Sequence, residues 1–95
     1  MLFNYDTRID RNNETVPYIE FDYRDLKTEA DWQALRDIIG AIKIQLDCNC
    51  HVELDPLKET LMNYHKLKPD AFILRIDIYI ETWKVQSSNK KSLLP

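Results

Sequence analysis

The sequence predicts an α+β fold: a two-layer open sandwich, with a four-stranded sheet and two helices on one face, in the order ββαβαβ. Four stretches of the 95-residue chain alternate apolar and polar side chains, as strands with one buried face do. Two other stretches repeat apolar side chains at helical spacing and begin at residues typical of helix N-termini. Strands and helices of this kind must cover each other's apolar faces, which gives the two layers.

The strand predicted at residues 71–85 organises the core. Its even positions from Phe72 to Ile80 are all apolar, whereas its odd positions include charged and aromatic residues. Successive side chains of a strand point to opposite faces, so the segment is predicted as one long strand with an apolar face and a mixed, charged face.

An antiparallel hairpin is predicted near the N-terminus. Residues 2–10 and 17–24 both alternate, and the polar stretch 11–14 between them contains two asparagines, which tolerate the left-handed backbone of tight turns. Pro17 opens the second run, where its missing N–H group costs little.

The first helix is predicted over residues 29–39. Thr28 is a good N-cap, and Asp31 three residues later resembles a capping box. The apolar residues that follow at helical spacing are Trp32, Leu35, Ile38 and Ile39. Gly40 is expected to end the helix, because helix C-termini often need a residue with positive φ.

The second helix is predicted to start at Asp55 as N-cap, with Pro56 in the first helical position, and to stop before Pro69. Its inward stripe consists of Leu57, Leu61, Tyr64 and Leu67. The organising strand follows directly after it.

A strand is predicted at residues 41–54, where apolar and polar residues alternate without a break. At about 3.3 Å per residue such a strand is long for a small domain, so a bulge or bend is expected near residues 47–49.

The alternative for this segment is a continuation of the first helix through Ile42 and Leu46, which keeps a helical seam. The strand is favoured because a helix would leave Ile44, Cys48 and Val52 off that seam. One long strand, a bent strand and a helix continuation all remain open.

Residues 1–85 are predicted to form one globular domain, and residues 86–95 a flexible C-terminal tail. The sequence has no apolar run of membrane-spanning length and does not begin like a signal peptide, so a cytoplasmic protein is expected. A single glycine in the whole chain excludes glycine-rich phosphate loops.

Two cysteines and two histidines raise the question of a zinc site. On the predicted strand Cys48 and Cys50 point into the core while His51 points away, and His65 lies on the second helix. Four such side chains cannot meet around one ion, so neither a metal nor another cofactor is expected. The cysteines are expected to be buried and reduced.

Charge is distributed unevenly along the chain. The formal net charge is −3, with −6 in residues 1–55 and +3 in residues 56–95. Nucleic acid is an unlikely partner, because the predicted strands carry carboxylates that phosphate would repel. The distribution is better suited to another protein, or to a second copy of the chain.

The sheet face without helices is the predicted binding surface. Its candidate residues are Asp22, Arg24, His51, Glu53, Arg75, Asp77, Tyr79, Glu81 and Trp83. We expect a non-enzymatic protein-binding module, such as a small inhibitor, antagonist or immunity-type protein, that acts through this open charged face or through a strand edge. The alternative is a small enzyme that uses His51 with neighbouring carboxylates for acid–base chemistry.

A homodimer is also expected from the organising strand. The strand would be longer than the helix layer, so residues 79–85, with Tyr79 and Trp83, should project beyond it. A projecting apolar strand end needs a partner, and tyrosine and tryptophan often anchor interfaces. The alternative is that Trp83 folds back over the hairpin and closes the core of the monomer.

Overall fold

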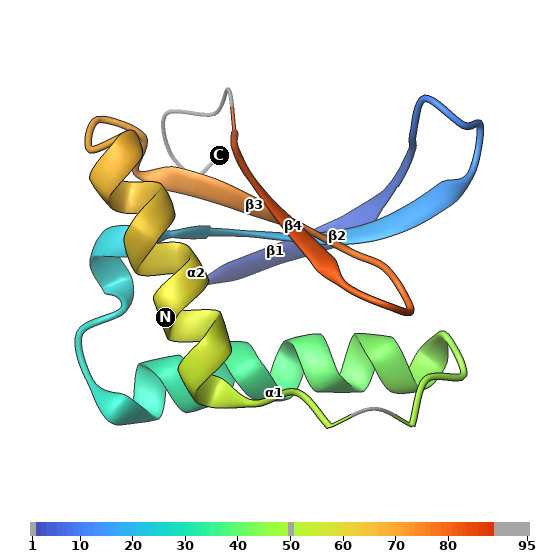
Figure 1. Cartoon of the computed structure of the whole chain (residues 1–95), viewed down its shortest axis with the longest axis horizontal. Coiled ribbons are helices and arrows are strands. Elements are labelled where there is room, and N and C mark those ends of the chain that lie inside the picture. Colours follow the sequence, from blue (N-terminus) through green and yellow to red (C-terminus); the bar gives the residue numbers. More distant parts are fainter. Residues whose placement is uncertain (1, 50, 89–95) are drawn as a thin grey trace.

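The computed structural model describes residues 2–49 and 51–88 and shows two layers, an antiparallel sheet with both helices on one of its faces (Figure 1). The elements in chain order are β1 (Phe3–Ile9), β2 (Thr15–Asp22), a short 3-10 helix (Tyr23–Asp25), α1 (Glu29–Gln45), α2 (Leu54–Leu67), β3 (Ile73–Ile78) and β4 (Trp83–Ser87). The predicted α+β class, the open four-stranded sheet and the two helices on one face are confirmed. Of the four predicted strands, the first two are present, the one at residues 41–54 is absent, and the one at residues 71–85 is two strands.

The sheet has the order β1-β2-β3-β4, and every neighbouring pair is antiparallel. In the central pair, Ile19 lies opposite Ile76 and Phe21 opposite Leu74, and all four side chains are fully buried. Their partners in the helix layer are Leu35, Ile39, Leu57 and Leu61. The core therefore lies between the two central strands and the helices.

Helix α1 does not end at Gly40 but continues to Gln45, so the helical alternative for residues 41–54 is correct at its start. Gly40 has no positive φ, whereas Asp47 has a φ of 61° just past the helix. Ile39 and Ile42 are buried on the same seam, and this tertiary burial outweighs the low helix propensity of glycine.

The strand predicted at residues 41–54 is wrong. Residues 46–53, apart from the undescribed residue 50, form no helix or strand. Cys48 and Val52 are buried nonetheless: Val52 belongs to the core cluster, and Cys48 Sγ lies 3.4 Å from the carbonyl oxygen of Ile80 in the β3–β4 turn. The alternating pattern came from the end of a helix followed by an irregular segment.

The organising segment 71–85 is two strands rather than one. The chain reverses between β3 and β4, where the Tyr79 amide donates to the Thr82 carbonyl over 2.9 Å. The order along the chain is therefore ββααββ. Gln86 and Ser87, predicted as the start of the tail, belong to β4, and residues 89–95 lie outside the described residues.

The helix starts follow the sequence to different degrees. The capping box at α1 is confirmed: the Asp31 amide donates to Thr28 Oγ1 at 3.2 Å, and the Thr28 amide donates to Asp31 Oδ2 at 2.9 Å. Helix α2 begins at Leu54, with Glu53 as an N-cap that makes no side-chain hydrogen bond. The predicted N-cap Asp55 thus lies within the first turn.

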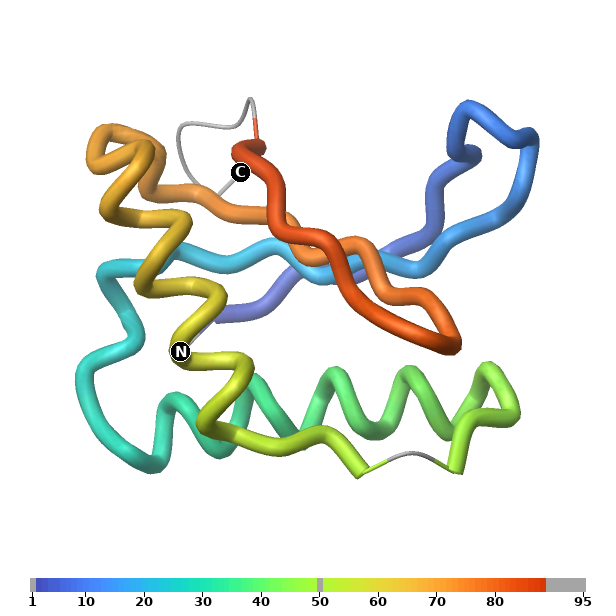
Figure 2. The backbone as a smooth tube through the Cα atoms, viewed as in Figure 1, coloured from blue at the N-terminus to red at the C-terminus, as the bar shows by residue number. Residues whose placement is uncertain are grey.

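The two hairpins separate at one end of the sheet (Figure 2). Pairing of β2 with β3 runs from Asp22 to Tyr18 and stops there, whereas β1 and β2 remain paired to the end of both strands. Pro17 follows at the separation and has no N–H group to offer. An opening results between the β1–β2 turn and the β3–β4 turn, next to the C-terminal end of α1.

Candidate functional site

A buried carboxylate organises the open face of the sheet. Asp77 on β3 has no solvent exposure. Arg8 donates to both of its oxygens, from Nε to Oδ1 at 3.1 Å and from a terminal nitrogen to Oδ2 at 2.6 Å. Gln86 Nε2 donates to Oδ2 at 3.0 Å, and Arg75 Nε lies 3.0 Å from Oδ1, although its N–H is not aligned for a hydrogen bond. One carboxylate therefore holds two guanidinium groups in place.

Arg8 reaches this carboxylate across an intervening strand. It lies opposite Val16 in the β1–β2 register, while Asp77 lies opposite Tyr18 in the β2–β3 register. The long arginine side chain thus passes over β2 on the face that no helix covers. The hydrogen bonds to Asp77 raise the pKa of Arg8 above its usual value, so the arginine remains charged.

A cavity of about 600 Å³ opens above these groups, and we call it the basic hollow. It is lined by Arg8, Asp10, Arg11, Asn12, Glu14, Arg75, Tyr79, Lys84 and Gln86. Four of these residues are basic and two are acidic, so the hollow is suited to an anionic group even though the whole chain has a net negative charge.

Much of the acidic charge around the hollow is already engaged. Asp77 is bound by the arginines, and Asp10 Oδ1 accepts hydrogen bonds from the amides of Asn12 and Glu14 at 2.9 and 3.0 Å. Neither Arg11 nor Lys84 forms an ion pair within the part of the chain that the structure describes. Lys84 Nζ lies 5.3 Å from the centre of the Tyr79 ring, and neither charge is neutralised by these ion pairs, so both can pair with an anionic ligand.

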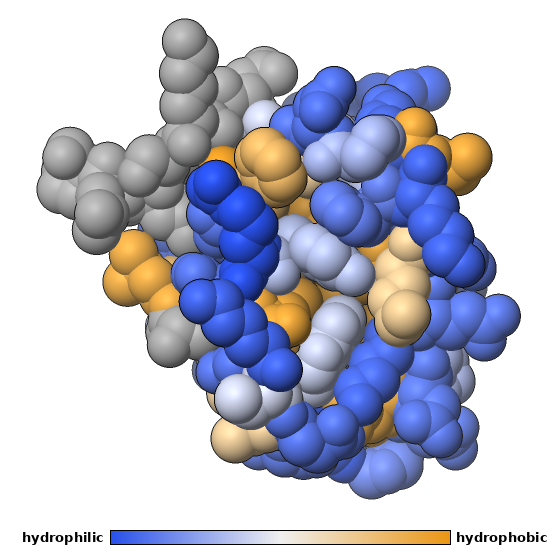
Figure 3. Space-filling model, turned by 90° about the vertical axis from the view of Figure 1, so that its left-hand side faces the viewer, coloured by the Kyte–Doolittle hydropathy of each residue, from blue (hydrophilic) through white to orange (hydrophobic). Residues whose placement is uncertain are grey.

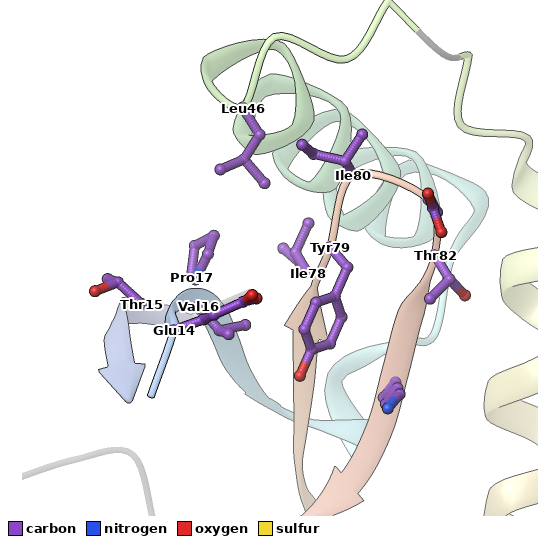
Figure 4. Close-up of a pocket in the computed structure, with 11 residues that line it drawn as sticks. Glu14, Thr15, Val16, Pro17, Leu46, Ile78, Tyr79, Ile80 and Thr82 are labelled. Atoms are coloured by element: carbon purple, nitrogen blue, oxygen red, sulfur yellow. The ribbon is translucent and has the colours of Figure 1, made fainter. Parts of the chain in front are cut away.

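A second cavity of about 410 Å³ lies beside the hollow, where the hairpins separate (Figure 4). We call it the apolar cleft, and its apolar wall consists of Val16, Pro17, Leu46, Ile78 and Ile80. The cleft and the basic hollow share Glu14, Tyr79 and Lys84. The two cavities are thus adjoining parts of one surface.

Three residues of the predicted binding surface come together here. Arg75 and Tyr79 line the basic hollow and Asp77 lies beneath it, as their odd positions in one alternating segment suggest. Glu81 lies in the β3–β4 turn and lines the apolar cleft.

Asp22 and Arg24 lie at the other end of β2. They form an ion pair of 2.7 Å, and the Arg24 guanidinium sits 4.4 Å from the centre of the Phe72 ring. The hydrogen bond from Arg24 lowers the pKa of Asp22. This pair is separate from the basic hollow.

Trp83 belongs to the opposite face of the sheet. It lies opposite Ile78, packs against the core, and holds Lys43 Nζ 5.4 Å from its ring centre. The predicted projecting strand end is therefore absent, because the chain turns back after Tyr79 and Trp83 helps to close the core of the monomer.

His51 and Glu53 lie in the connection between α1 and α2, not on the open face. His51 Nδ1 is 3.0 Å from a terminal nitrogen of Arg36. The Asp77 carboxylate belongs to the open face of the sheet and is bound by Arg8 and Arg75. It is therefore not one of the carboxylates that the predicted acid–base chemistry of His51 could use.

The metal-ligand candidates are also apart. Cys48 is buried but disulfide-bonded, so the prediction of a reduced thiol is wrong for it, and Cys50 lies outside the described residues. His65 on α2 stacks on Tyr23 with ring centres 4.4 Å apart. Within residues 2–49 and 51–88, no three histidine, cysteine or acidic side chains are grouped to hold a metal ion.

Sequence reasoning did not assign Arg11, Lys84 and Gln86 to the site. Lys84 was missed because it faces Asp77 only after the unpredicted chain reversal. Arg11 lies in the turn of the predicted β1–β2 hairpin, and its place beside Arg75 follows only from the order of the strands.

The end of the molecule formed by α2 and the start of α1 offers a contrast (Figure 3). Its surface is largely hydrophilic, and apolar side chains appear there in small separate patches. The two adjoining cavities lie at the opposite end, near the C-terminus of α1.

The fold and these cavities define a small α+β open-sandwich protein with a basic hollow on its uncovered sheet face. Comparisons with protein-family models, with curated proteins and with solved structures find no match for the chain. None of the helices in residues 2–49 and 51–88 combines the length and apolar character needed to span a membrane.

Proposed function

We propose that this chain is a non-enzymatic protein-binding module whose open sheet face engages an acidic surface of another protein. The basic hollow is the observation that carries the proposal. Two of its cations, Arg11 and Lys84, have no ion-pair partner among the described residues, and two more, Arg8 and Arg75, are held in place by Asp77.

Pre-organisation makes such a hollow effective. An arginine held by a buried carboxylate loses little conformational freedom when its remaining N–H groups bind a partner, and ordering of side chains is a main cost of association. Acidic groups of a partner would also be steered to the hollow at low ionic strength. A small inhibitor, antagonist or immunity-type protein would fit this mode of binding.

A second copy of the chain is a further partner that we propose. Among residues 2–49 and 51–88, β4 pairs with β3 alone and is an edge strand of the sheet, and we propose that its outer backbone groups receive another strand. The contact would then involve the backbone of β4 rather than a projecting Tyr79 and Trp83.

Catalysis by His51 has less support. The His51 ring contacts the Arg36 guanidinium, 3.0 Å from Nδ1, and this group carries a positive charge and is not a carboxylate that could take part in acid–base chemistry. Binding through the open face remains the function that the geometry supports best.

Affinity capture from a lysate of the producing cells tests the proposal. The bait is the full chain, compared with the double variant Arg11→Glu, Lys84→Glu and with a matched control, Lys66→Glu, Lys68→Glu, on the exposed end of α2. We expect a partner that the wild type and the control retain, that the hollow variant loses, and that elutes as salt rises. Equal retention by both variants would place the binding surface elsewhere.

A further inference from the structure

We propose that the basic hollow and the apolar cleft form one groove for an extended peptide segment of the partner, in which a large apolar residue is flanked by acidic residues. This inference rests on the proposed function and adds the chemistry of the segment that is recognised.

Continuity between the two cavities is the first argument. Glu14, Tyr79 and Lys84 line both, so a ligand in one cavity meets the other. In Figure 4 the Tyr79 hydroxyl points away from Leu46. The ring thus presents its apolar body to the cleft and its polar tip to the other side, as tyrosines do at interfaces.

The separation of β2 and β3 creates the apolar part of the groove. Val16 and Ile78 are almost completely buried at its base, whereas Ile80 is 55% exposed at its edge. Lys43 Nζ is 3.2 Å from the Ile80 carbonyl and thereby fixes this part of the turn. A leucine or phenylalanine side chain would exclude water from the cleft and cover the exposed Ile80.

The charge of the hollow indicates that the residues flanking the apolar side chain of the peptide are acidic. The basic side chains of the hollow come from β1, the β1–β2 turn, β3 and β4, so they are spread over the surface rather than gathered at one point. A single carboxylate can be satisfied by one arginine. Several carboxylates along a peptide match the spread better than the one carboxylate of a fatty acid, and the occupant is therefore a peptide.

Glu14 opposes an acidic ligand, because it lies where the two cavities meet. It is also exposed, so replacing it should not disturb the core. The substitution Glu14→Gln should therefore strengthen binding, an effect that unfolding cannot imitate.

The test uses short fluorescein-labelled peptides and the full chain, with fluorescence anisotropy as the readout. The first peptide has one leucine flanked by aspartates, the second has alanine in place of the leucine, and the third has asparagines in place of the aspartates. We expect the first peptide to bind most tightly and each change to weaken binding by about tenfold.

Protein variants locate the contact. Ile80→Ser and the double variant Arg11→Glu, Lys84→Glu should each weaken binding of the first peptide by about tenfold, and Glu14→Gln should strengthen it. Ile44→Ser and the double variant Lys66→Glu, Lys68→Glu make matching changes at exposed positions that line neither cavity and should leave binding unchanged. Circular dichroism spectra confirm that each variant is folded.

Several results would overturn the inference: no peptide binds, the alanine peptide binds as well as the leucine peptide, Ile80→Ser has no effect, or octanoate displaces the peptide as effectively as unlabelled peptide does. The capture experiment separates this failure from that of the proposed function. A partner lost by the Arg11, Lys84 variant but retained by Ile80→Ser leaves the proposed function standing without the apolar part. A partner that the Arg11, Lys84 variant and the Ile80→Ser variant both retain would contradict the proposed function and the peptide groove alike.

Discussion

Among single residues, Asp77 is the charged group whose replacement we expect to affect stability most. Replacing it by asparagine keeps the shape but leaves Arg8 and Arg75, which are 29% and 24% exposed in their side chains, without their shared negative charge. Removing one partner of a buried ion pair costs several kcal/mol, and we expect Asp77→Asn to lower the free energy of unfolding by about 3 kcal/mol in urea titrations.

The matched control is Asp22→Asn, which breaks the ion pair with the more exposed Arg24. Exposed pairs contribute little, so the loss should stay below about 1 kcal/mol. Equal losses of unfolding free energy for the two substitutions would show that burial does not make the Asp77 ion pairs more stabilising than the exposed pair.

Lys43 should give the stability a dependence on alkaline pH. Burial lowers the pKa of its ammonium group below the unfolded value of 10.5. Between the folded and the unfolded pKa the unfolded chain binds more protons, so the contribution of this group to the free energy of unfolding rises with pH in that window.

The variant Lys43→Met lacks the increase in unfolding free energy with pH that Lys43 contributes. Its stability relative to the wild type should therefore fall as the pH increases from 7 toward 10.5, as measured by urea unfolding at a series of pH values. A constant difference across this range would show that the folded-state pKa of Lys43 is not lowered.

At the level of elements, Gly40 is an avoidable weak point of α1. A Cβ atom built there meets nothing within 4 Å, and the backbone has no positive φ. Gly40→Ala should therefore raise the free energy of unfolding by about 0.5–1 kcal/mol. The reverse change at the exposed neighbour, Ala41→Gly, should lower it by a similar amount, and thermal unfolding followed by circular dichroism measures both.

Elements with strong local signals could be predicted from the sequence. The β1–β2 hairpin has its turn at Asn13, whose φ is 62°, and the capping box of Thr28 marks the start of α1. The reversal between β3 and β4 could not be predicted in the same way. Among the described residues, only Asn13 and Asp47 have positive φ, so the turn contains no position that calls for glycine or asparagine.

Residues of the candidate site could be predicted where the strand that holds them was predicted correctly. Arg75, Asp77 and Tyr79 share one face of a correctly alternating segment, so they were found together. His51 and Glu53 were assigned to that face by a strand that is in fact an irregular connection. The alternation of residues 41–54 came from the buried seam of α1 and from the buried Val52. Tertiary packing determines which of these side chains are buried, and the local sequence pattern alone does not reveal it.

At the scale of the whole molecule, Trp83 packs the edge strand β4 against the core. Trp83→Ala should lower the free energy of unfolding by about 2 kcal/mol, because its half-buried ring packs against the core. The sedimentation equilibrium mass should not change, since the ring faces the interior of the monomer. A fall in mass with unchanged stability would instead place Trp83 in a contact between two copies.

The chain order ββααββ divides the molecule into two halves, one a hairpin followed by a helix and the other a helix followed by a hairpin. The halves meet in the sheet where β2 pairs with β3, a joint that brings Asp22 to Ile73 and Tyr18 to Asp77. Within each hairpin the paired residues are near in sequence, so each can form early, whereas closing the joint requires a long loop. Mild truncations at the joint, such as Ile19→Val and Ile76→Val, should therefore slow folding, and a truncation on the edge strand, such as Val85→Ala, should mainly speed unfolding.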